Sequence, residues 1–258
     1  IPLVPQILTN RETQWIDTLD YLSSLGYTEV NINCGCPSAT VVTKGKGSGM
    51  LVDINTLDAF LEFVFNNRDR GNIQMDISVK TRLGIESEDE FTSIWQVYNR
   101  YPFSEVILHP RLQKDFYKNS PRMNCFEYAA AHTDLKLCYN GDLFQAKHLR
   151  AFAKQYPETE AVMLGRGLIG NPGLIREFQT GEQILKEELR EYHDRIYHGY
   201  LEALDCTRDA LFKMKELWFY LSFQFADAEK HLKAVRKAES GNKYEIAVNR
   251  FFAECDLK

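Results

Sequence analysis

Residues 28–49, TEVNINCGCPSATVVTKGKGSG, join a short apolar run to a loop that is rich in cysteine, glycine and lysine. The run 28–33 is short and partly β-branched, as buried parallel strands are. It ends at Asn33, and two cysteines follow before Pro37. The stretch therefore predicts a buried strand that delivers polar groups from its carboxyl end. A mobile, basic loop follows, of the kind that covers a substrate.

Five other short apolar runs have the same character, and segments with helical spacing separate them. The runs are 3–8, 75–80, 105–110, 135–140 and 161–165, and the helical segments are 11–25, 54–67, 88–101, 124–132 and 145–156, with a short one after Pro172. Alternating strands and helices predict a parallel α/β fold. A closed TIM-type (β/α)8 barrel needs eight strands, and six are predicted. Either the sheet is open, or the first two strands are missing from this chain.

The pattern changes after residue 180, where helical spacing continues without any strand signal. We therefore expect a partial (β/α) barrel over residues 1–180 and an all-α C-terminal subdomain over residues 181–258. Residues 206–243 hold eight Lys or Arg and five Asp or Glu, a net charge of +3 against −5 for the whole chain. A solvated helix face explains this excess, and so does a contact with nucleic acid.

Composition excludes several classes of protein. A net charge of −5 excludes a molecule that is basic overall, although not a local basic face. No run of 18 apolar residues exists, so no membrane span is expected. Six cysteines in 258 residues are too sparse for a disulfide scaffold. We therefore expect a cytoplasmic, monomeric protein with free thiols.

Active sites of parallel barrels lie at the carboxyl ends of the strands. Each predicted strand ends there in polar, cationic or glycine residues: Gln6; Asn33; Lys80 with Arg82; His109 with Arg111; Asn140, Gly141 and Asp142; Gly165 and Arg166. Structural alternatives exist, since a lysine can snorkel to solvent, a histidine can be a satisfied structural residue and Asn-Gly is a turn dipeptide. The glycine-rich segment 165–172 is typical of the phosphate-binding loops that follow the last barrel strands.

The two neighbouring cysteines do not fit a metal site or a disulfide. No second CxC or CxxC and no HxxxH accompanies them, so no metal site is expected. A disulfide between residues two apart is strained. Cys34 still belongs to the strand end and is expected to be structural. Cys36 lies further into the loop and is the better candidate for an acting thiol.

These motifs together resemble the signature of the tRNA-dihydrouridine synthases, flavin enzymes with a (β/α)8 barrel and a C-terminal helical domain. The resemblance covers about residues 1–178 and is carried by VNINCGCPSATVVTKGKGSGML (30–51), SVKTRLG (78–84), LHPRLQKDFY (108–117), YNGDL (139–143) and VMLGRGLIGNP (162–172). It implies FMN-dependent reduction of uridine in tRNA to 5,6-dihydrouridine, with NADPH as the reductant. tRNA is then the expected macromolecular partner.

The resemblance also implies roles for matching positions, with Cys36 as the general acid. FMN contacts are implied for Gln6, Lys80, His109, Asn140, Gly141, Asp142, Gly165 and Arg166. Asn33 would lie close to flavin and substrate. Further candidates for substrate contact are Arg82, Arg111, Lys44, Lys46, Arg208 and Lys213.

One departure and three alternatives remain open. Members of the family begin with a strand that ends in an A-P-M-like segment touching the flavin, and this chain has none. Part of the FMN site is therefore expected to be missing. The alternatives are an FMN barrel acting on a free pyrimidine or enone, a Schiff-base lyase using Lys80, and an RNA-binding relative that has lost catalysis.

Overall fold

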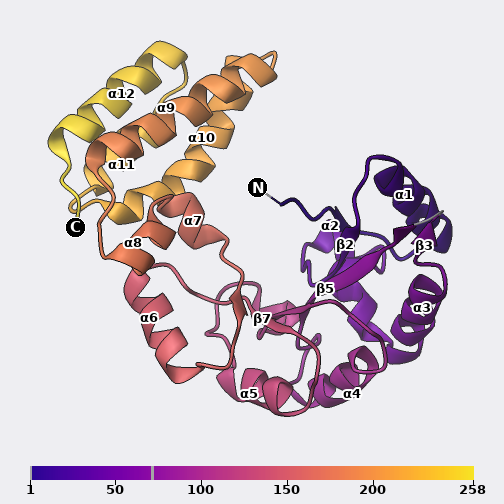
Figure 1. Cartoon of the computed structure of the whole chain (residues 1–258). Helices are drawn as coiled ribbons and strands as arrows, with labels where there is room; N and C mark the ends of the chain where they lie inside the picture. Colours follow the sequence, from indigo (N-terminus) through magenta and orange to yellow (C-terminus); the bar gives the residue numbers. More distant parts are fainter. Residues whose placement is uncertain (1, 71–72) are drawn as a thin grey trace. The chain divides into compact units, whose positions relative to one another are not determined.

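The computed structural model describes residues 2–70 and 73–258 of the chain. They form two compact units (Figure 1). The first unit runs to Gly141 and includes Pro157–Met163, and the second comprises Asp142–Tyr156 and Leu164–Lys258. The expected domain division at residue 180 stays a prediction.

One parallel sheet forms the centre of the first unit. Its strands are β1 (Gln6–Ile7), β2 (Glu29–Cys34), β5 (Asp76–Arg82), β6 (Val106–His109), β7 (Leu137–Tyr139) and β8 (Ala161–Val162). They pair in the order β1-β2-β5-β6-β7-β8, with every neighbour parallel. The predicted parallel α/β fold is therefore confirmed. Two further strands that would close the barrel stay a prediction.

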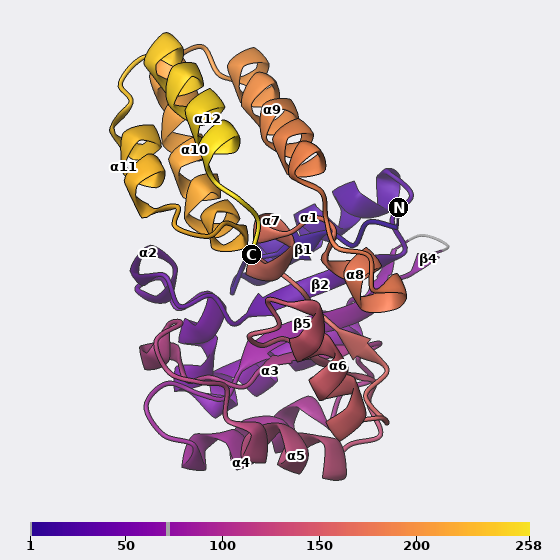
Figure 2. The same ribbon diagram turned by 90° about the vertical axis from the view of Figure 1, so that its left-hand side faces the viewer.

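Helices cover one side of this sheet. They are α1 (Glu12–Ser24), α3 (Ile54–Asn66), α4 (Asp89–Tyr98) and α5 (Met123–Ala131), and they form an arc outside the strands (Figures 1 and 2). Each lies within a few residues of its predicted range, because its apolar residues recur at helical spacing. Asp53 caps α3 by accepting a hydrogen bond from the Asn55 amide at 3.1 Å. Trp15, Leu61 and Ile94 are fully buried.

Several short elements were not expected from the sequence. They are α2 (Ala39–Val42), the 3-10 helices η1 (Gly47–Val52) and η2 (Gln113–Asp115), and an antiparallel pair, β3 (Asp69–Arg70) with β4 (Ile73–Gln74). The last predicted strand, 161–165, was too long. It ends at Val162, and an additional short helix that was not predicted begins at Arg166. The short helix predicted after Pro172 is present at Leu174–Thr180. The glycines of 165–170 look like a loop in sequence, but Gly167 is needed for close packing, since a side chain there would meet the Leu143 carbonyl at 2.5 Å.

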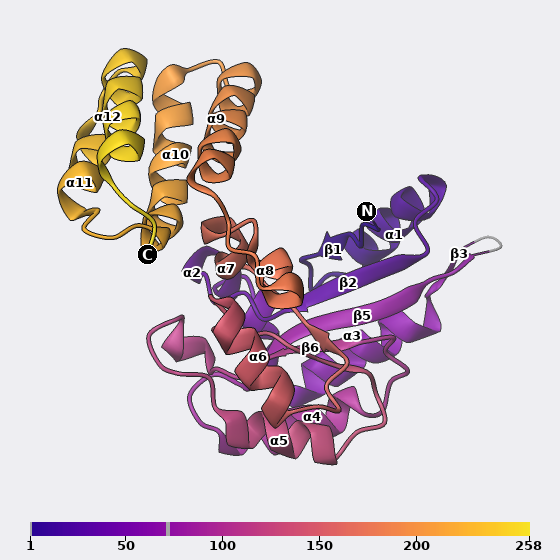
Figure 3. The ribbon, with the colours of Figure 1, turned by 60° about the vertical axis from the view of Figure 1, so that its left-hand side comes forward.

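The second unit is helical. Its helices are α6 (Ala146–Gln155), α7 (Arg166–Gly170), α8 (Leu174–Thr180), α9 (Lys186–Ala203), α10 (Thr207–Leu221), η3 (Ser222–Gln224), α11 (Glu229–Lys237) and α12 (Gly241–Glu254). Helices α9–α12 lie side by side (Figure 3). Their shared core includes Leu189, Met214, Val235 and Phe251.

A network of buried hydrogen-bonded side chains crosses this helical core. Nδ1 of His193 lies 2.8 Å from the Asp194 carboxylate, which can only accept, so Nδ1 carries the proton. Nε2 of His193 therefore accepts from the Tyr244 hydroxyl at 2.7 Å, and the Tyr244 oxygen accepts from Trp218 Nε1 at 2.8 Å. Every donor in this network has an acceptor, and the arrangement requires neutral His193.

We expect this network to make the stability of the helices depend on pH. Burial lowers the pKa of His193 from 6.5 to about 4, with the Asp194 carboxylate opposing the shift. The unfolded chain therefore takes up the proton first, and about 3 kcal/mol of stability, present above pH 6.5, is lost as the pH falls to 4. Urea unfolding between pH 7.5 and 4 should show this slope in the wild type. If His193→Gln showed the same dependence of unfolding free energy on pH, His193 would not be the group responsible.

Candidate active site

The register of the sheet sorts polar and apolar side chains onto opposite faces. Paired residues of parallel strands share a face, and the pairs Asn31–Ser78, Asn33–Lys80 and Arg82–His109 all lie on one of them. The alternate residues Val30, Ile32, Ile77, Val79, Val106 and Leu108 are buried on the other. Three of the predicted strand ends, those of β2, β5 and β6, thus bring their polar side chains together.

Amide side chains connect the first three strands of this polar face. Gln6 Nε2 donates to Asn31 Oδ1 at 2.7 Å, and Gln6 Oε1 accepts from Asn33 Nδ2 at 2.8 Å. Asn31 Nδ2 in turn donates to Ser78 Oγ at 3.0 Å. The predicted cofactor residue Gln6 and the predicted substrate residue Asn33 are therefore in direct contact, and each fixes the orientation of the other.

Asn33 also shapes the loop that carries Cys36. Its Oδ1 accepts from the amides of Gly35 at 3.1 Å and of Cys36 at 2.9 Å. The Cys36 carbonyl accepts from the amide and the hydroxyl of Ser48, at 3.0 and 2.9 Å. Gly47, with φ of +59°, lets the chain turn back here, because a side chain would meet the Cys36 carbonyl at 2.7 Å. Both ends of the loop are thus tied to the backbone of Cys36.

The two cysteines of this motif have different surroundings. Cys34 is fully buried beside Met50, and burial raises the pKa of its thiol to about 12. Cys36 is half-buried at the start of the loop. All six cysteines are free thiols. The structure therefore supports a structural Cys34 and leaves Cys36 as the thiol that a ligand can reach.

Arg82 is buried and holds two loops together. Its Nε donates to the Gly35 carbonyl, and its two terminal nitrogens donate to the carbonyls of Leu112 and Phe116, at 2.9, 2.9 and 3.0 Å. Burial lowers its pKa, but an arginine stays charged in proteins. Arg82 therefore positions the Cys36 loop and the loop after β6, and its direct contact with a substrate stays a prediction.

His109 and Arg111 form a second buried pair. Arg111 donates to His109 Nε2 at 2.9 Å and to the Asn119 carbonyl at 2.5 Å. Because a guanidinium can only donate, Nε2 must accept, and the proton of neutral His109 lies on Nδ1. Tyr117 lies next to the imidazole, with ring centroids 5.9 Å apart. Like Arg82, Arg111 is directed toward protein groups in this structure.

Buried Asp115 anchors the loop after β6, a role that the sequence pattern does not predict. Its carboxylate accepts from the Leu112 amide at 2.8 Å and pairs with Arg122. Burial raises its pKa, but the hydrogen bonds from Arg122, Asn119 and Leu112 outweigh this and hold the pKa near 2. Gln113 of the same loop accepts from Ser48 Oγ at 3.1 Å and so contacts the Cys36 loop. Nothing in the spacing of these polar residues indicates such a contact.

Lys80 is the least compensated charge on the polar face. Among the residues that the structure describes, no carboxylate pairs with its ammonium group. Burial, followed by the positive charge of Arg82, lowers its pKa to about 8, and Cys138 and Cys36 oppose the shift. A half-buried cation without an anion is costly, so the site favours an anionic ligand beside Lys80.

The remaining predicted cofactor residues divide between the two units. Asn140, in the first unit, donates to the Met163 carbonyl at 2.8 Å, and Gly141 follows it. Asp142, Gly165 and Arg166 belong to the second unit. Arg166 pairs with Asp142 at 2.7 Å and lies over the Phe144 ring. Its guanidinium is therefore already oriented, with about a quarter of the side chain exposed.

The predicted RNA-contacting cations lie in both units. Lys44 is exposed, and Lys46 donates to Gln14 at 3.2 Å. Arg208 and Lys213 are exposed on α10. Within residues 2–70 and 73–258, no three His, Cys, Asp or Glu side chains gather as metal ligands would. In the same part of the chain, every helix is too short or too polar to cross a bilayer.

Replacing Lys80 should stabilise the protein. A shift of the pKa from 10.5 to about 8 means that the charged ammonium costs the folded state about 2 kcal/mol at pH 7, after allowance for its partial exposure. Lys80→Met should therefore raise the free energy of unfolding in urea at pH 7. The gain should vanish above pH 10.5, where the lysine is neutral in both states. Lys46→Met is the matched control, and a Lys80→Met protein less stable than wild type would contradict this account.

Comparisons with known proteins agree with the motifs and the fold. A "Probable tRNA-dihydrouridine synthase" of Staphylococcus aureus (strain MRSA252) is 29% identical over 210 residues, covering 77% of this chain and 60% of that protein. One of Helicobacter pylori (strain J99), with the same name, is 28% identical over 193 residues, covering 72% and 55%. The chain thus spans little more than half the length of these relatives.

The family described as Dihydrouridine synthase (Dus) matches residues 1–254, nearly the whole chain. This match confirms the resemblance seen in the cysteine, lysine, histidine and glycine motifs. The chain belongs to the dihydrouridine synthase family.

Proposed function

We propose that this protein reduces uridines of tRNA to 5,6-dihydrouridine, with FMN as its cofactor and NADPH as its reductant. Membership of the family and the names of the relatives support the reaction and the substrate. The observation that carries the proposal is Lys80, a half-buried cation that lacks a carboxylate partner on a face of amide and imidazole groups. A site built this way suits a polar ring system that carries negative charge.

The residues present fit FMN in their chemistry. Lys80 supplies a positive charge, Arg111 orients the His109 imidazole, and Gln6 is held by two asparagines. The other residues proposed to hold FMN are Asn140, Gly141, Asp142, Gly165 and Arg166, the last of which suits a phosphate. When bound, FMN supplies the hydride that adds to C6 of the uracil ring.

Cys36 is proposed to supply the proton that completes the reduction. Addition of a hydride at C6 leaves an electron pair and a negative charge at C5 and on the neighbouring carbonyl. The thiol of Cys36 gives its proton to C5, and the thiolate regains a proton from water. The Cys36 amide donates to Asn33 Oδ1 and the Cys36 carbonyl accepts from Ser48, so the thiol approaches from a fixed point of the loop.

The target uridine must leave its base stack to reach such a site, as in other enzymes that act on a base. Lys44 and Lys46 beside the loop, and Arg208 and Lys213 on α10, are proposed to hold the RNA backbone. Arg82 and Arg111 act by positioning the loops rather than by binding RNA. This division explains why Arg82 and Arg111 are buried while Lys44 is exposed.

The lowered pKa of Lys80 also supports one second candidate, a Schiff-base lyase. An amine with a pKa near 8 is partly neutral at working pH and can attack a carbonyl. Borohydride would then trap a substrate on Lys80. Activity that depends on flavin, without any trapped adduct, excludes this candidate.

The proposal predicts a change in the tRNA of cells that lack the gene. We expect at least one uridine position to lose dihydrouridine on deletion, as measured by mass spectrometry of digested tRNA. The complete gene should restore it, and Lys80→Met should not. Because Lys80→Met is expected to be more stable than wild type, its failure cannot be ascribed to unfolding. Unchanged dihydrouridine in the deletion strain would contradict the proposal.

A further inference from the structure

Two cavities of the second unit share part of their lining. The first, of about 310 Å³, includes Lys147, Arg150 and Asn171, and the second, of about 1020 Å³, includes Lys233 and Arg236. Phe223 and Lys258 line both. The two cavities are therefore neighbours within this unit, with Phe223 and Lys258 in the wall of both, and the pair is called the groove below.

The shared wall is aromatic and exposed. Phe223 is 57% exposed and Phe219, one helical turn before it, is 50% exposed. Their rings pack edge to face, with centroids 5.6 Å apart, and the Arg236 guanidinium lies 5.9 Å from the Phe219 ring. Exposure of two adjacent phenylalanines is unusual, since such residues normally lie on the buried face of a helix, and it indicates a binding surface. A flat, supported ring beside cations is a surface on which a base can stack.

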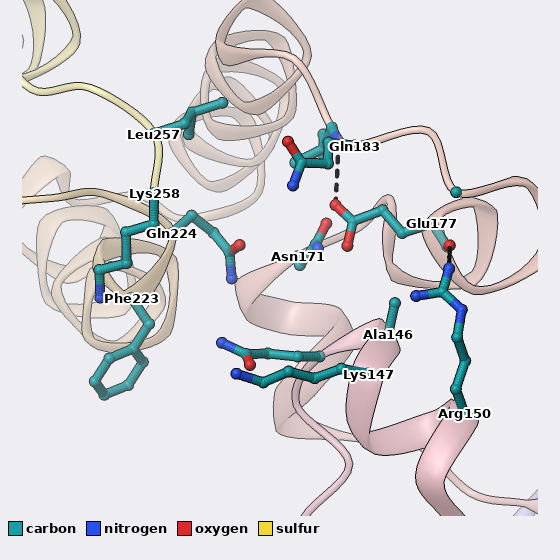
Figure 4. Close-up of a pocket in the computed structure, with 13 residues that line it drawn as sticks. Ala146, Lys147, Arg150, Asn171, Glu177, Gln183, Phe223, Gln224, Leu257 and Lys258 are labelled. Carbon is teal, nitrogen blue, oxygen red and sulfur yellow. Dashed lines mark hydrogen bonds between the residues drawn. The ribbon is translucent and has the colours of Figure 1, made fainter. Parts of the chain in front are cut away.

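Cations lie on both sides of this ring. The α11 side carries Lys230, Lys233, Arg236 and Lys237, all exposed, against Asp227 and Glu229. Within the described part of the chain, none of these four cations forms a salt bridge. On the other side, Lys147 reaches across the smaller cavity toward the part where Phe223 and Lys258 lie (Figure 4). An excess of positive charge on both sides of an aromatic ring matches a strand of phosphates with bases between them.

The smaller cavity contains a polar group that is ready to donate. Asn171 is 2% exposed, and its Oδ1 accepts from the Gly173 amide at 2.9 Å. Its side chain lies between Gln224 and Glu177 in the lining (Figure 4). Glu177 is engaged with the Ile184 amide at 3.1 Å, and Arg150 donates to the Glu177 carbonyl. The amides of Asn171 and Gln224 can therefore donate to oxygens of a ligand in this cavity.

We infer that this groove binds an unpaired segment of RNA, with one base stacked on Phe223. Phosphates on one side of that base contact Lys147 and Arg150, and phosphates on the other contact Lys233 and Arg236. The inference rests on the proposed function in naming tRNA as the source of the strand. It adds a site for single-stranded nucleotides away from the polar face of the sheet, and it makes Phe223 a determinant of how the tRNA is held.

Fluorescence anisotropy with the 258-residue chain tests the inference. An unstructured, labelled oligouridine should bind more tightly than a blunt RNA duplex. Phe223→Ala should weaken binding of the single strand about tenfold, the value for loss of one stacked base. Phe212→Ala is the matched control, because Phe212 lies on the preceding helix α10 and is 69% exposed, but lines neither cavity. Phe223→Trp should retain binding.

Salt dependence supplies the second measurement. Replacing Lys233 and Arg236 by Gln together should reduce the slope of log K against log salt by about 1.4, since each phosphate contact on a single strand contributes about 0.7. Equal effects of Phe223→Ala and Phe212→Ala, or equal affinity for duplex and single strand, would overturn the inference. A dimer that Phe223→Ala dissociates would show a protein interface instead. None of these readouts needs flavin or dihydrouridine, so this inference and the proposed function can fail separately.

Discussion

Alternation of side chains along parallel strands is the constraint on which the site depends. With β2, β5 and β6 in register, every second residue faces the helices and is mostly apolar, and the residues between them face the other way. Asn33 and Lys80 therefore share one face, and Cys34 and Thr81 share the opposite one. The same alternation separates two cysteines that are neighbours in sequence. Cys34 is the last residue of β2 and faces the helices, and Cys36 lies beyond the strand in the loop.

Buried hydrogen bonds then hold the loops that the strands deliver. Arg82 joins the Cys36 loop to the loop after β6, and Asp115 closes the latter through Arg122 and the Leu112 amide. The buried charges of Arg82, Arg111 and Asp115 have backbone and side-chain partners, which is the condition under which burial of charge is tolerated. Lys80 is the exception. The charge of Lys80 lowers stability, whereas the charges of Arg82 and Arg111 are compensated by hydrogen-bond partners. We infer that Lys80 binds a ligand rather than stabilising the fold.

The sequence predicts the strands and long helices well, because periodicity and strand ends are local signals. Features that depend on partners distant in the sequence cannot be predicted in this way. Arg82 looks like a ligand-binding cation at a strand end, but carbonyls some thirty residues away bury it. Helix α7 was missed because glycines that permit close packing look like a loop. Phe219 and Phe223 are spaced like core residues of a helix, and only the structure shows that both are exposed.

The most direct test of this account compares the two thiols of the motif in one assay. Dihydrouridine formation on unmodified tRNA is measured for Cys36→Ala and Cys34→Ala, with rates normalised to bound flavin. Loss of a general acid costs about 100-fold or more, so Cys36→Ala should fall at least that far while Cys34→Ala stays within a few fold of wild type. Comparable losses in both variants, or an active Cys36→Ala, would contradict the assignment of Cys36 as the proton donor.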